Sequence, residues 1–300
     1  MSREGKGFLL ISITAIAWGF LAIALKFASH FLEPITIVWL RFSLAFIFLA
    51  LYCSIQNISS FKILKSPPLS LLIAALFLSF NYVGFMKGIA MTSPGNAQII
   101  IQIGPILFAL LSAYLFKEKI FFQQILGAMI ALIGFLLFYQ NKIEHLLSNS
   151  NEYFAGNIWL VFAAIAWAFY SVINKKLIQK YSSLSLNLVI YLVASLLFLP
   201  FVHFDQLLIL NWWQSLLVIF LGLNTLIAYG CLSKSFEYLD SSKISTVITL
   251  NPILTIIILN LLEHFFPKLL GSENITFSGY LGAFLVILGA IFIVSKRKKN

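Results

Sequence analysis

Runs of about 20 apolar residues recur along almost the whole chain, and they restrict its fold more than any other feature. A helix rises 1.5 Å per residue, so a run of this length crosses the hydrocarbon core of a bilayer. We predict ten spans, at 8–27, 34–55, 69–87, 94–116, 121–140, 156–173, 184–203, 212–232, 242–262 and 276–294. The expected fold class is therefore an all-α integral membrane protein with ten transmembrane helices.

The composition and the placement of charge support this class. Hydrophobic residues make up 61% and charged residues 10% of the chain, whereas soluble domains carry roughly 25% charged residues. The net charge of +10 does not indicate nucleic acid, because the basic residues sit at span ends. With the N-terminus in the cytoplasm, most fall on the inner side, which predicts that both termini are cytoplasmic. The basic residues expected at outer ends are Lys26, Lys87, Lys142 and Lys268.

The stretch 92–118 differs from plain lipid-facing sequence. Gln98 and Gln102 are four residues apart, so they share one helical face. Pro105 lacks an amide proton, which should leave the carbonyl of Ile101 unpaired and kink the helix. A kinked helix with one polar stripe is typical of a span that lines a cavity.

This stretch has a counterpart in the second half of the chain. Aligning the two prolines gives the pairs Pro105 and Pro252, Gln98 and Ser245, and Gln102 and Thr249. Other residues repeat as well: Ala15–Trp18 as Ala164–Trp167, Lys26 as Lys175, Tyr82 as Tyr229, and Gly127 and Gly134 as Gly282 and Gly289. We therefore predict two halves, 1–140 and 156–300, joined by a connecting loop at 141–155.

Each half holds five predicted spans, an odd number, so the second half should enter the membrane from the opposite side. This is an inverted-topology repeat, a construction common in secondary transporters. It predicts a substrate site near the midplane, where the halves face each other, with alternating access. Pro105 and Pro252 are the predicted hinges.

Several motifs carry a family resemblance that covers nearly the whole chain. They are Ala17-Trp18-Gly19, Leu40-Arg41-Phe42, Pro105 followed by Glu118 after thirteen residues, Gln124-Ile125-Leu126-Gly127-Ala128, and Gly134. In these the chain resembles the drug/metabolite transporter superfamily, in its ten-span EamA-like branch. The resemblance implies a secondary transporter of small metabolites, often an exporter, in a bacterial inner membrane, with spans 5 and 10 at the periphery. The second half departs from the pattern, since Pro252 precedes Glu263 by eleven residues and Ile190 stands opposite Arg41.

Polar residues inside spans are the candidates for substrate binding, because they are costly in lipid and usually face protein or water. The candidates are Trp18, Asn81, Tyr82, Gln98, Gln102, Trp167, Tyr170, Asn224, Tyr229, Ser245 and Thr249. Interhelical hydrogen bonding is the alternative for each of them, and for a single Ser or Thr we favour it. The tryptophans and tyrosines suit an aromatic wall, with ordinary packing as the alternative.

Two charged residues have possible roles in transport. Arg41 lies seven residues beyond Pro34, about 10 Å along the helix. We prefer snorkelling to the outer interface. The alternatives are a counter-charge for an anionic substrate group and a partner for a helix C-terminus. Glu118, at a span end, is a remaining candidate for coupling, but we expect it to pair with neighbouring lysines. No acid lies at mid-membrane, which argues for facilitated diffusion or exchange over proton coupling.

The sequence favours transport over other functions. It contains no HExxH, GxSxG or GxxxxGK[ST] motif, so we predict no enzyme activity, no cofactor and no metal site. Our first choice of substrate is a neutral or aromatic amino acid, and the alternative is a larger metabolite such as a nucleoside derivative or vitamin. A membrane scaffold is the alternative from another class. The expected partners are the small-molecule substrate and the lipid bilayer, without nucleic acid, and a monomer is possible.

Overall fold

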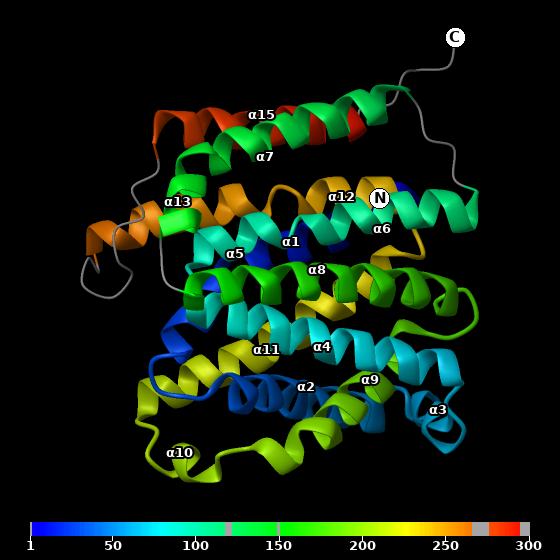
Figure 1. The fold of residues 1–300 in the computed structure, drawn as a ribbon. Helices are drawn as coiled ribbons and strands as arrows, with labels where there is room; N and C mark the ends of the chain where they lie inside the picture. The colour runs from blue at the N-terminus through cyan, green and yellow to red at the C-terminus, as the bar shows by residue number, and fades with distance from the viewer. Residues whose placement is uncertain (1, 118–121, 149–150, 266–275, 295–300) are drawn as a thin grey trace.

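The computed structural model describes residues 2–117, 122–148, 151–265 and 276–294. In this part of the chain the regular structure is helical, and the long helices run roughly along one direction (Figure 1). They are α1 (Arg3–Ala28), α2 (Pro34–Gln56), α4 (Leu69–Met91), α5 (Pro94–Ile100), α6 (Ile103–Phe116), α7 (Phe122–Ser148), α8 (Asn151–Leu177), α9 (Ser183–Phe198), α11 (Trp212–Ser235), α12 (Ser241–Ile248), α13 (Asn251–Phe265) and α15 (Phe277–Val294). Short helices η1 (Ile58–Phe61), α3 (Lys62–Lys65), η2 (Leu199–Phe201) and α10 (Phe204–Leu208) lie in the connections.

Within the described residues, eight segments are long and apolar enough to cross a membrane. They are α1, α2, α4, α5 with α6, α8, α9 with η2, α11, and α12 with α13. Two shorter apolar runs, Ile125–Leu137 and Phe277–Val286, lie in α7 and α15. The predicted connecting loop at 141–155 is wrong for most of its length, because α7 continues to Ser148 and α8 begins at Asn151. Its Lys, Glu and Leu residues favour helix, so its polarity does not end the helix.

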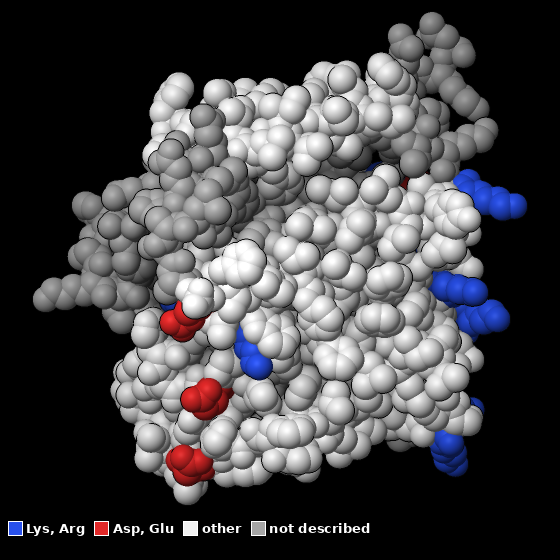
Figure 2. Space-filling view, in the orientation of Figure 1, with Lys and Arg blue, Asp and Glu red and all other residues white. Residues whose placement is uncertain are grey.

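The surface carries an apolar belt between two charged ends. Figure 2 shows most visible Lys and Arg side chains at the end where α3 lies, and most visible Asp and Glu side chains at the opposite end. Large apolar side chains are exposed between the ends, among them Leu110 and Leu136. Such a contiguous apolar surface is suited to lipid.

Both predicted kinks are present as breaks in the helix. The first lies at Ile101 and Gln102, between α5 and α6, and the second at Thr249 and Leu250, between α12 and α13. The carbonyl of Ile101 is not left unpaired as predicted, because it accepts a 2.9 Å hydrogen bond from the amide of Gly104. A tighter turn thus gives the Ile101 carbonyl the hydrogen bond that Pro105, which has no N–H, cannot donate.

Helix α1 lies at the centre of the bundle and receives side-chain donors from three helices. Consecutive residues of a helix point about 100° apart, so neighbouring carbonyls can meet different partners. The donors are Asn224 of α11 to Ala17 (2.7 Å), Gln98 of α5 to Trp18 (3.0 Å), and Thr255 of α13 to Gly19 (2.9 Å). The Ala17-Trp18-Gly19 motif is therefore a junction that ties both broken helices to α1.

Helices α7 and α15 pack along each other on one side of the bundle, at the top of Figure 1. A Cβ atom added to Gly134 would lie 2.6 Å from the carbonyl oxygen of Gly282, and one added to Gly289 would overlap that of Gly127. The four repeated glycines thus permit close approach of the two backbones, as small residues do in membrane helix pairs.

Two lysines bind the segments that lead into the broken helices. The Nζ atom of Lys26, near the end of α1, donates to the carbonyls of Ile89, Ala90 and Thr92 at 3.2, 3.1 and 2.9 Å. Near the end of α8, Lys175 donates to the hydroxyl of Ser241 at 2.6 Å. Lys26 therefore holds the α4–α5 connection, and Lys175 holds the start of α12.

Candidate functional site

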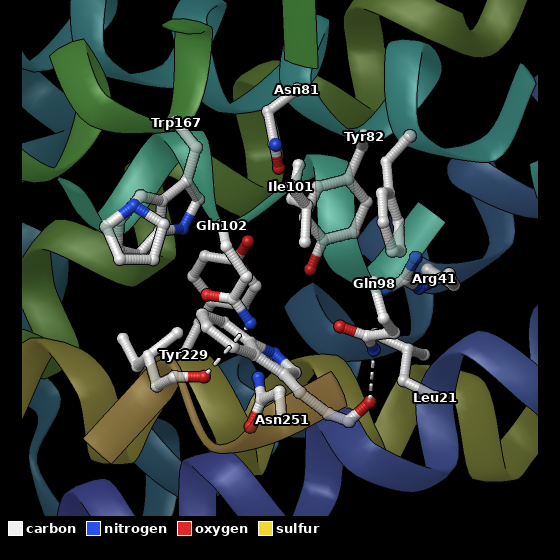
Figure 3. A pocket seen from close by; sticks show the side chains of 14 residues that line it. Leu21, Arg41, Asn81, Tyr82, Gln98, Ile101, Gln102, Trp167, Tyr229 and Asn251 are labelled. Carbon is white, nitrogen blue, oxygen red and sulfur yellow. Dashed lines mark hydrogen bonds between the residues drawn. The ribbon is translucent and has the colours of Figure 1, made fainter. Parts of the chain in front are cut away.

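A buried cavity lies between the two helix breaks, near the middle of the bundle (Figure 3). About 60 Å³ of it is open to the centre of a water-sized molecule, whereas one buried water needs roughly 10–15 Å³ by that measure. The lining residues are Trp18, Leu21, Arg41, Asn81, Tyr82, Phe85, Gln98, Ile101, Gln102, Pro105, Trp167, Tyr229, Ile248 and Asn251. They come from α1, α2, α4, α8, α11 and the two broken helices.

Four aromatic rings form a continuous row along the cavity. Ring centroids are 5.5 Å apart for Tyr82 and Tyr229, 5.3 Å for Tyr229 and Trp18, and 6.1 Å for Trp18 and Trp167. These spacings and tilted planes are those of favourable aromatic pairs. The row contains the two repeat pairs of the sequence, Trp18 with Trp167 and Tyr82 with Tyr229, and it provides a surface for an apolar or aromatic group.

Arg41 ends this row, and the preferred prediction that it snorkels to the interface is wrong. Its side chain is buried, with 2% exposure. The guanidinium carbon lies 4.2 Å from the centroid of the Tyr82 ring, and Nε donates a 3.1 Å hydrogen bond to the hydroxyl of Thr225. Because α4, α9 and α11 cover that face of α2, the side chain has no route to the interface. It lines the cavity instead.

The two glutamines of the first broken helix both line the cavity. Nε2 of Gln98 donates to the carbonyl of Trp18 at 3.0 Å, and Nε2 of Gln102 donates to the carbonyl of Ile248 at 3.3 Å. Each thus combines the two interpretations that the sequence left open, since one side chain both bridges helices and faces the cavity. Asn81 behaves in the same way through a 2.9 Å bond to the carbonyl of Ala163.

Four polar atoms of the lining are buried and have no hydrogen-bond partner among the described residues. They are Oε1 of Gln102, Oδ1 of Asn251, Nε1 of Trp167 and the hydroxyl oxygen of Tyr82. A buried polar group without a partner costs about 1–3 kcal/mol, so a solute or water that bonds to these atoms would be stabilised in the cavity. The two amide oxygens are acceptors, the indole N–H is a donor and the tyrosine hydroxyl can be either, so a matching solute carries both kinds of group.

Several sequence-predicted site residues lie outside the lining. Tyr170 packs behind the cavity, with its ring centroid 5.9 Å from that of Tyr229, and its hydroxyl accepts from Asn174 at 3.0 Å. Asn224 bonds to α1 as described above, and the hydroxyl of Thr249 donates to the carbonyl of Thr246 in its own helix. Ser245 and Pro252 are buried but do not line the cavity. Asn224 therefore bridges two helices and Thr249 bonds within its own helix, which is the alternative interpretation of these residues.

The sequence prediction missed the apolar part of the lining. Leu21, Phe85, Ile101 and Ile248 give no signal in a chain that is mostly apolar. Asn251, directly before Pro252, is a polar residue of a predicted span, and it does line the cavity. Glu118 lies outside the described residues, so its predicted pairing with lysines is not placed. In the described ranges no group of three or more His, Cys, Asp or Glu side chains could hold a metal ion.

A polytopic helical bundle whose cavity combines a largely apolar lining with a few polar groups, between two broken membrane helices, has the architecture of a membrane transport protein. The model of the EamA-like transporter family matches residues 5–140 and 154–295, and the chain belongs to this family. Its relatives are transporters rather than enzymes.

Relatives match over nearly the full chain. One, from Escherichia coli (strain K12), is described as "Uncharacterized inner membrane transporter YhbE"; it is 31% identical over 97% of this chain and 91% of its own length. An "Uncharacterized transporter" of Haemophilus influenzae is 32% identical over 95% of this chain and 93% of its own length. A "Probable amino-acid metabolite efflux pump" of Salmonella typhimurium is 29% identical over 60% of this chain and 56% of its own length. One solved crystal structure shares the fold, with a TM-score of 0.74 at 18% identity over 98% of both chains.

Proposed function

We propose that this protein is a secondary transporter, an exporter or exchanger, which carries small zwitterions by alternating access. Neutral and aromatic amino acids are the first choice of substrate. The observation that carries the proposal is the set of unpaired polar atoms beside an aromatic row in the cavity, which are Gln102 Oε1, Asn251 Oδ1, Trp167 Nε1 and the Tyr82 hydroxyl.

The chemistry of the lining matches an amino acid group by group. Amide oxygens of Gln102 and Asn251 suit the ammonium group, which is a donor only. The guanidinium of Arg41 suits the carboxylate, and the indole N–H of Trp167, across the cavity, suits an acceptor at the far end of a solute. The row from Tyr82 to Trp167 suits an apolar or aromatic side chain. The name of the Salmonella relative, a probable amino-acid metabolite efflux pump, points in the same direction.

We further propose ten spans arranged as two inverted repeats. The family model matches two segments, 5–140 and 154–295, and each contains one proline-broken helix pair. Helices α7 and α15, of 27 and 18 residues, would be the fifth and tenth spans. The basic end of the molecule would face the cytoplasm with both termini, by the positive-inside rule (Figure 2). The relatives support an inner membrane location.

The breaks supply a physical basis for alternating access. Each divides a membrane helix into two rods that can tilt separately, and each contributes lining residues to one cavity. Broken helices at the midplane are a recurrent construction in secondary transporters. Tilting α5 against α6, or α12 against α13, would open the cavity to one side and then the other.

Counterflow in proteoliposomes tests this function. Vesicles are loaded with one unlabelled compound, labelled phenylalanine is supplied outside, and no ion gradient is present. Transient, saturable uptake driven by loaded neutral amino acids is the expected result. If uptake occurs only when both the labelled and the loaded compound are nucleoside derivatives or vitamins, these compounds would replace amino acids as the proposed substrates. A linear, non-saturable flux would indicate a channel.

A further inference from the structure

We propose that Arg41 forms a carboxylate-binding subsite, so that solutes must carry an anionic group to occupy this cavity. The inference rests on the proposed function, because it takes the cavity as the transport site. It names the group of the substrate that is recognised and the residue that recognises it.

The first observation is a buried guanidinium without a carboxylate partner. Arg41, seven residues after the start of α2, is 2% exposed and forms no ion pair with any acid of the described residues. An arginine inside a membrane protein is costly and is usually paired or functional. The cation is held here by neutral groups alone, the hydroxyl of Thr225 and the face of Tyr82.

The second observation is that Arg41 is held in one orientation. The hydroxyl of Thr225 donates to the carbonyl of Leu221 at 3.0 Å, so its oxygen accepts from Nε of Arg41. The ring of Tyr82 supports the guanidinium face. Only Nε is used in a hydrogen bond among the described residues, and the two terminal nitrogens remain for a ligand. A guanidinium end presents two parallel N–H groups, which match the two oxygens of a carboxylate.

The third observation is the distribution of charge around the cavity. Arg41 is the single charged residue among the lining residues, and no acid lines the cavity. An anionic group would be attracted, while an amine without a carboxylate would bring a second positive charge into a site of low dielectric constant. Figure 3 shows Arg41 and Trp167 on opposite sides of the cavity, so a carboxylate at Arg41 directs the rest of the solute along the aromatic row.

Binding of four related compounds to the purified protein in nanodiscs tests the subsite by isothermal titration. Phenylalanine has both charged groups, and 3-phenylpropionate has the carboxylate alone. Phenethylamine and phenylalanine amide lack the carboxylate. We expect both carboxylates to bind, and the amine and the amide to bind about 10- to 100-fold more weakly than phenylalanine, the range for losing hydrogen bonds to a charged group.

The variant Arg41→Gln keeps a polar side chain and removes the charge and the paired donors. It should weaken binding of phenylalanine about 10- to 100-fold and remove the preference over phenylalanine amide. Arg41→Lys should restore only part of the preference, because an ammonium cannot present two parallel donors. Lys87→Gln is the matched control, since Lys87 is a cation that lies over Trp159, outside the lining, and the preference should be unchanged.

The outcomes separate the subsite from the proposed substrate. Equal binding of phenylalanine, its amide and phenethylamine would overturn the subsite, even if Arg41→Gln fails to fold, and would leave amino acid transport intact. Binding of 3-phenylpropionate without binding of phenylalanine would retain the subsite and reject amino acids as substrates. Folded protein that binds no carboxylate of this panel would overturn both.

Discussion

The side-chain amide of Gln102 donates a 3.3 Å hydrogen bond to the main-chain carbonyl of Ile248, which lies four residues before Pro252. In an unbroken helix this carbonyl would accept from the amide of residue 252, and proline has no such group. The first broken helix thus supplies a donor that the second one lacks. At the first break the corresponding carbonyl, of Ile101, accepts locally from Gly104. The two breaks are therefore satisfied differently, and Gln102 links them.

A double-mutant cycle tests this link. Gln102→Leu removes the donor and should lower the free energy of unfolding by about 1 kcal/mol, near the value of one interhelical hydrogen bond. In a Pro252→Ala background, residue 252 can donate to Ile248 itself, so the same substitution should cost less. The measurement is thermal or denaturant unfolding in detergent for the four proteins of the cycle.

Gln98→Leu is the control for this cycle. Gln98 also bonds a carbonyl across helices, that of Trp18, but residue 22 is an alanine with its own amide. The cost of Gln98→Leu should therefore be the same in the Pro252→Ala background as in the unmodified protein. A coupling equal to that of Gln102 would show that the cycle reports general loosening rather than the proposed pair.

The two prolines should matter more for turnover than for stability. Pro105→Ala or Pro252→Ala restores a helical donor and joins the two rods of a span more rigidly, which should slow the tilting that alternating access needs. We expect transport to fall about tenfold or more, an activation difference of about 1.4 kcal/mol, while folded yield stays near that of the unmodified protein. Equal losses in turnover and folded yield would refute the hinge role.

Proline and glutamine within an apolar run are local signals that a single sequence can show. Gln98, Gln102 and Pro105 all line the cavity. Arg41 shows the limit of such reasoning. Its distance from Pro34 gave its depth along the helix, but a single sequence does not fix the rotation of α2 about its axis. That rotation places Arg41 beside Tyr82 rather than toward the interface.

Hydroxyl residues show a second limit of prediction from sequence. Thr249 aligns with Gln102 across the repeat, yet its short side chain bonds to the carbonyl of Thr246 and does not reach the cavity. The aligned positions agree, but the reach of the side chains differs. Side-chain length must therefore be weighed before a role is transferred between repeats.

The glycine contact between α7 and α15 predicts a large effect from a small change. Gly134→Ala would place a Cβ atom 2.6 Å from the carbonyl oxygen of Gly282, a contact with backbone that no rotamer relieves. Separating the helices should lower the free energy of unfolding by about 1–3 kcal/mol. The measurement is the midpoint of thermal unfolding in detergent.

Gly230→Ala is the matched control for this contact. Its added Cβ atom meets nothing within 4 Å, and it lies within α11, where alanine favours helix over glycine by about 1 kcal/mol. It should leave the unfolding midpoint unchanged or raise it. A Gly134→Ala protein as stable as the control would contradict the close contact.

The two lysine contacts predict opposite changes in access to the cavity. Lys26 holds the connection between α4 and α5 through three carbonyls, and Lys175 holds Ser241 at the start of α12. They are repeat mates in the sequence, so in the proposed inverted arrangement Lys26 lies on the outer side and Lys175 on the inner side. Lys26→Met should loosen the outer side, and Lys175→Met the inner side. Access is measured with a membrane-impermeant maleimide at Leu21→Cys, a lining position, after Cys53 and Cys231 are replaced by alanine.

The expected result depends on the side from which the reagent is added. Lys26→Met should speed labelling about three- to tenfold from outside. A hydrogen bond from a charged group is worth about 1.5–3 kcal/mol, and water replaces part of this when the bond is lost. Lys175→Met should speed labelling from inside by a similar factor. Lys176→Met, which changes an exposed lysine next to Lys175, is the control and should alter neither rate. Faster labelling of the Lys26 variant from both sides would mean that the substitution loosens the whole bundle. The two lysines would then not control access from opposite sides of the membrane.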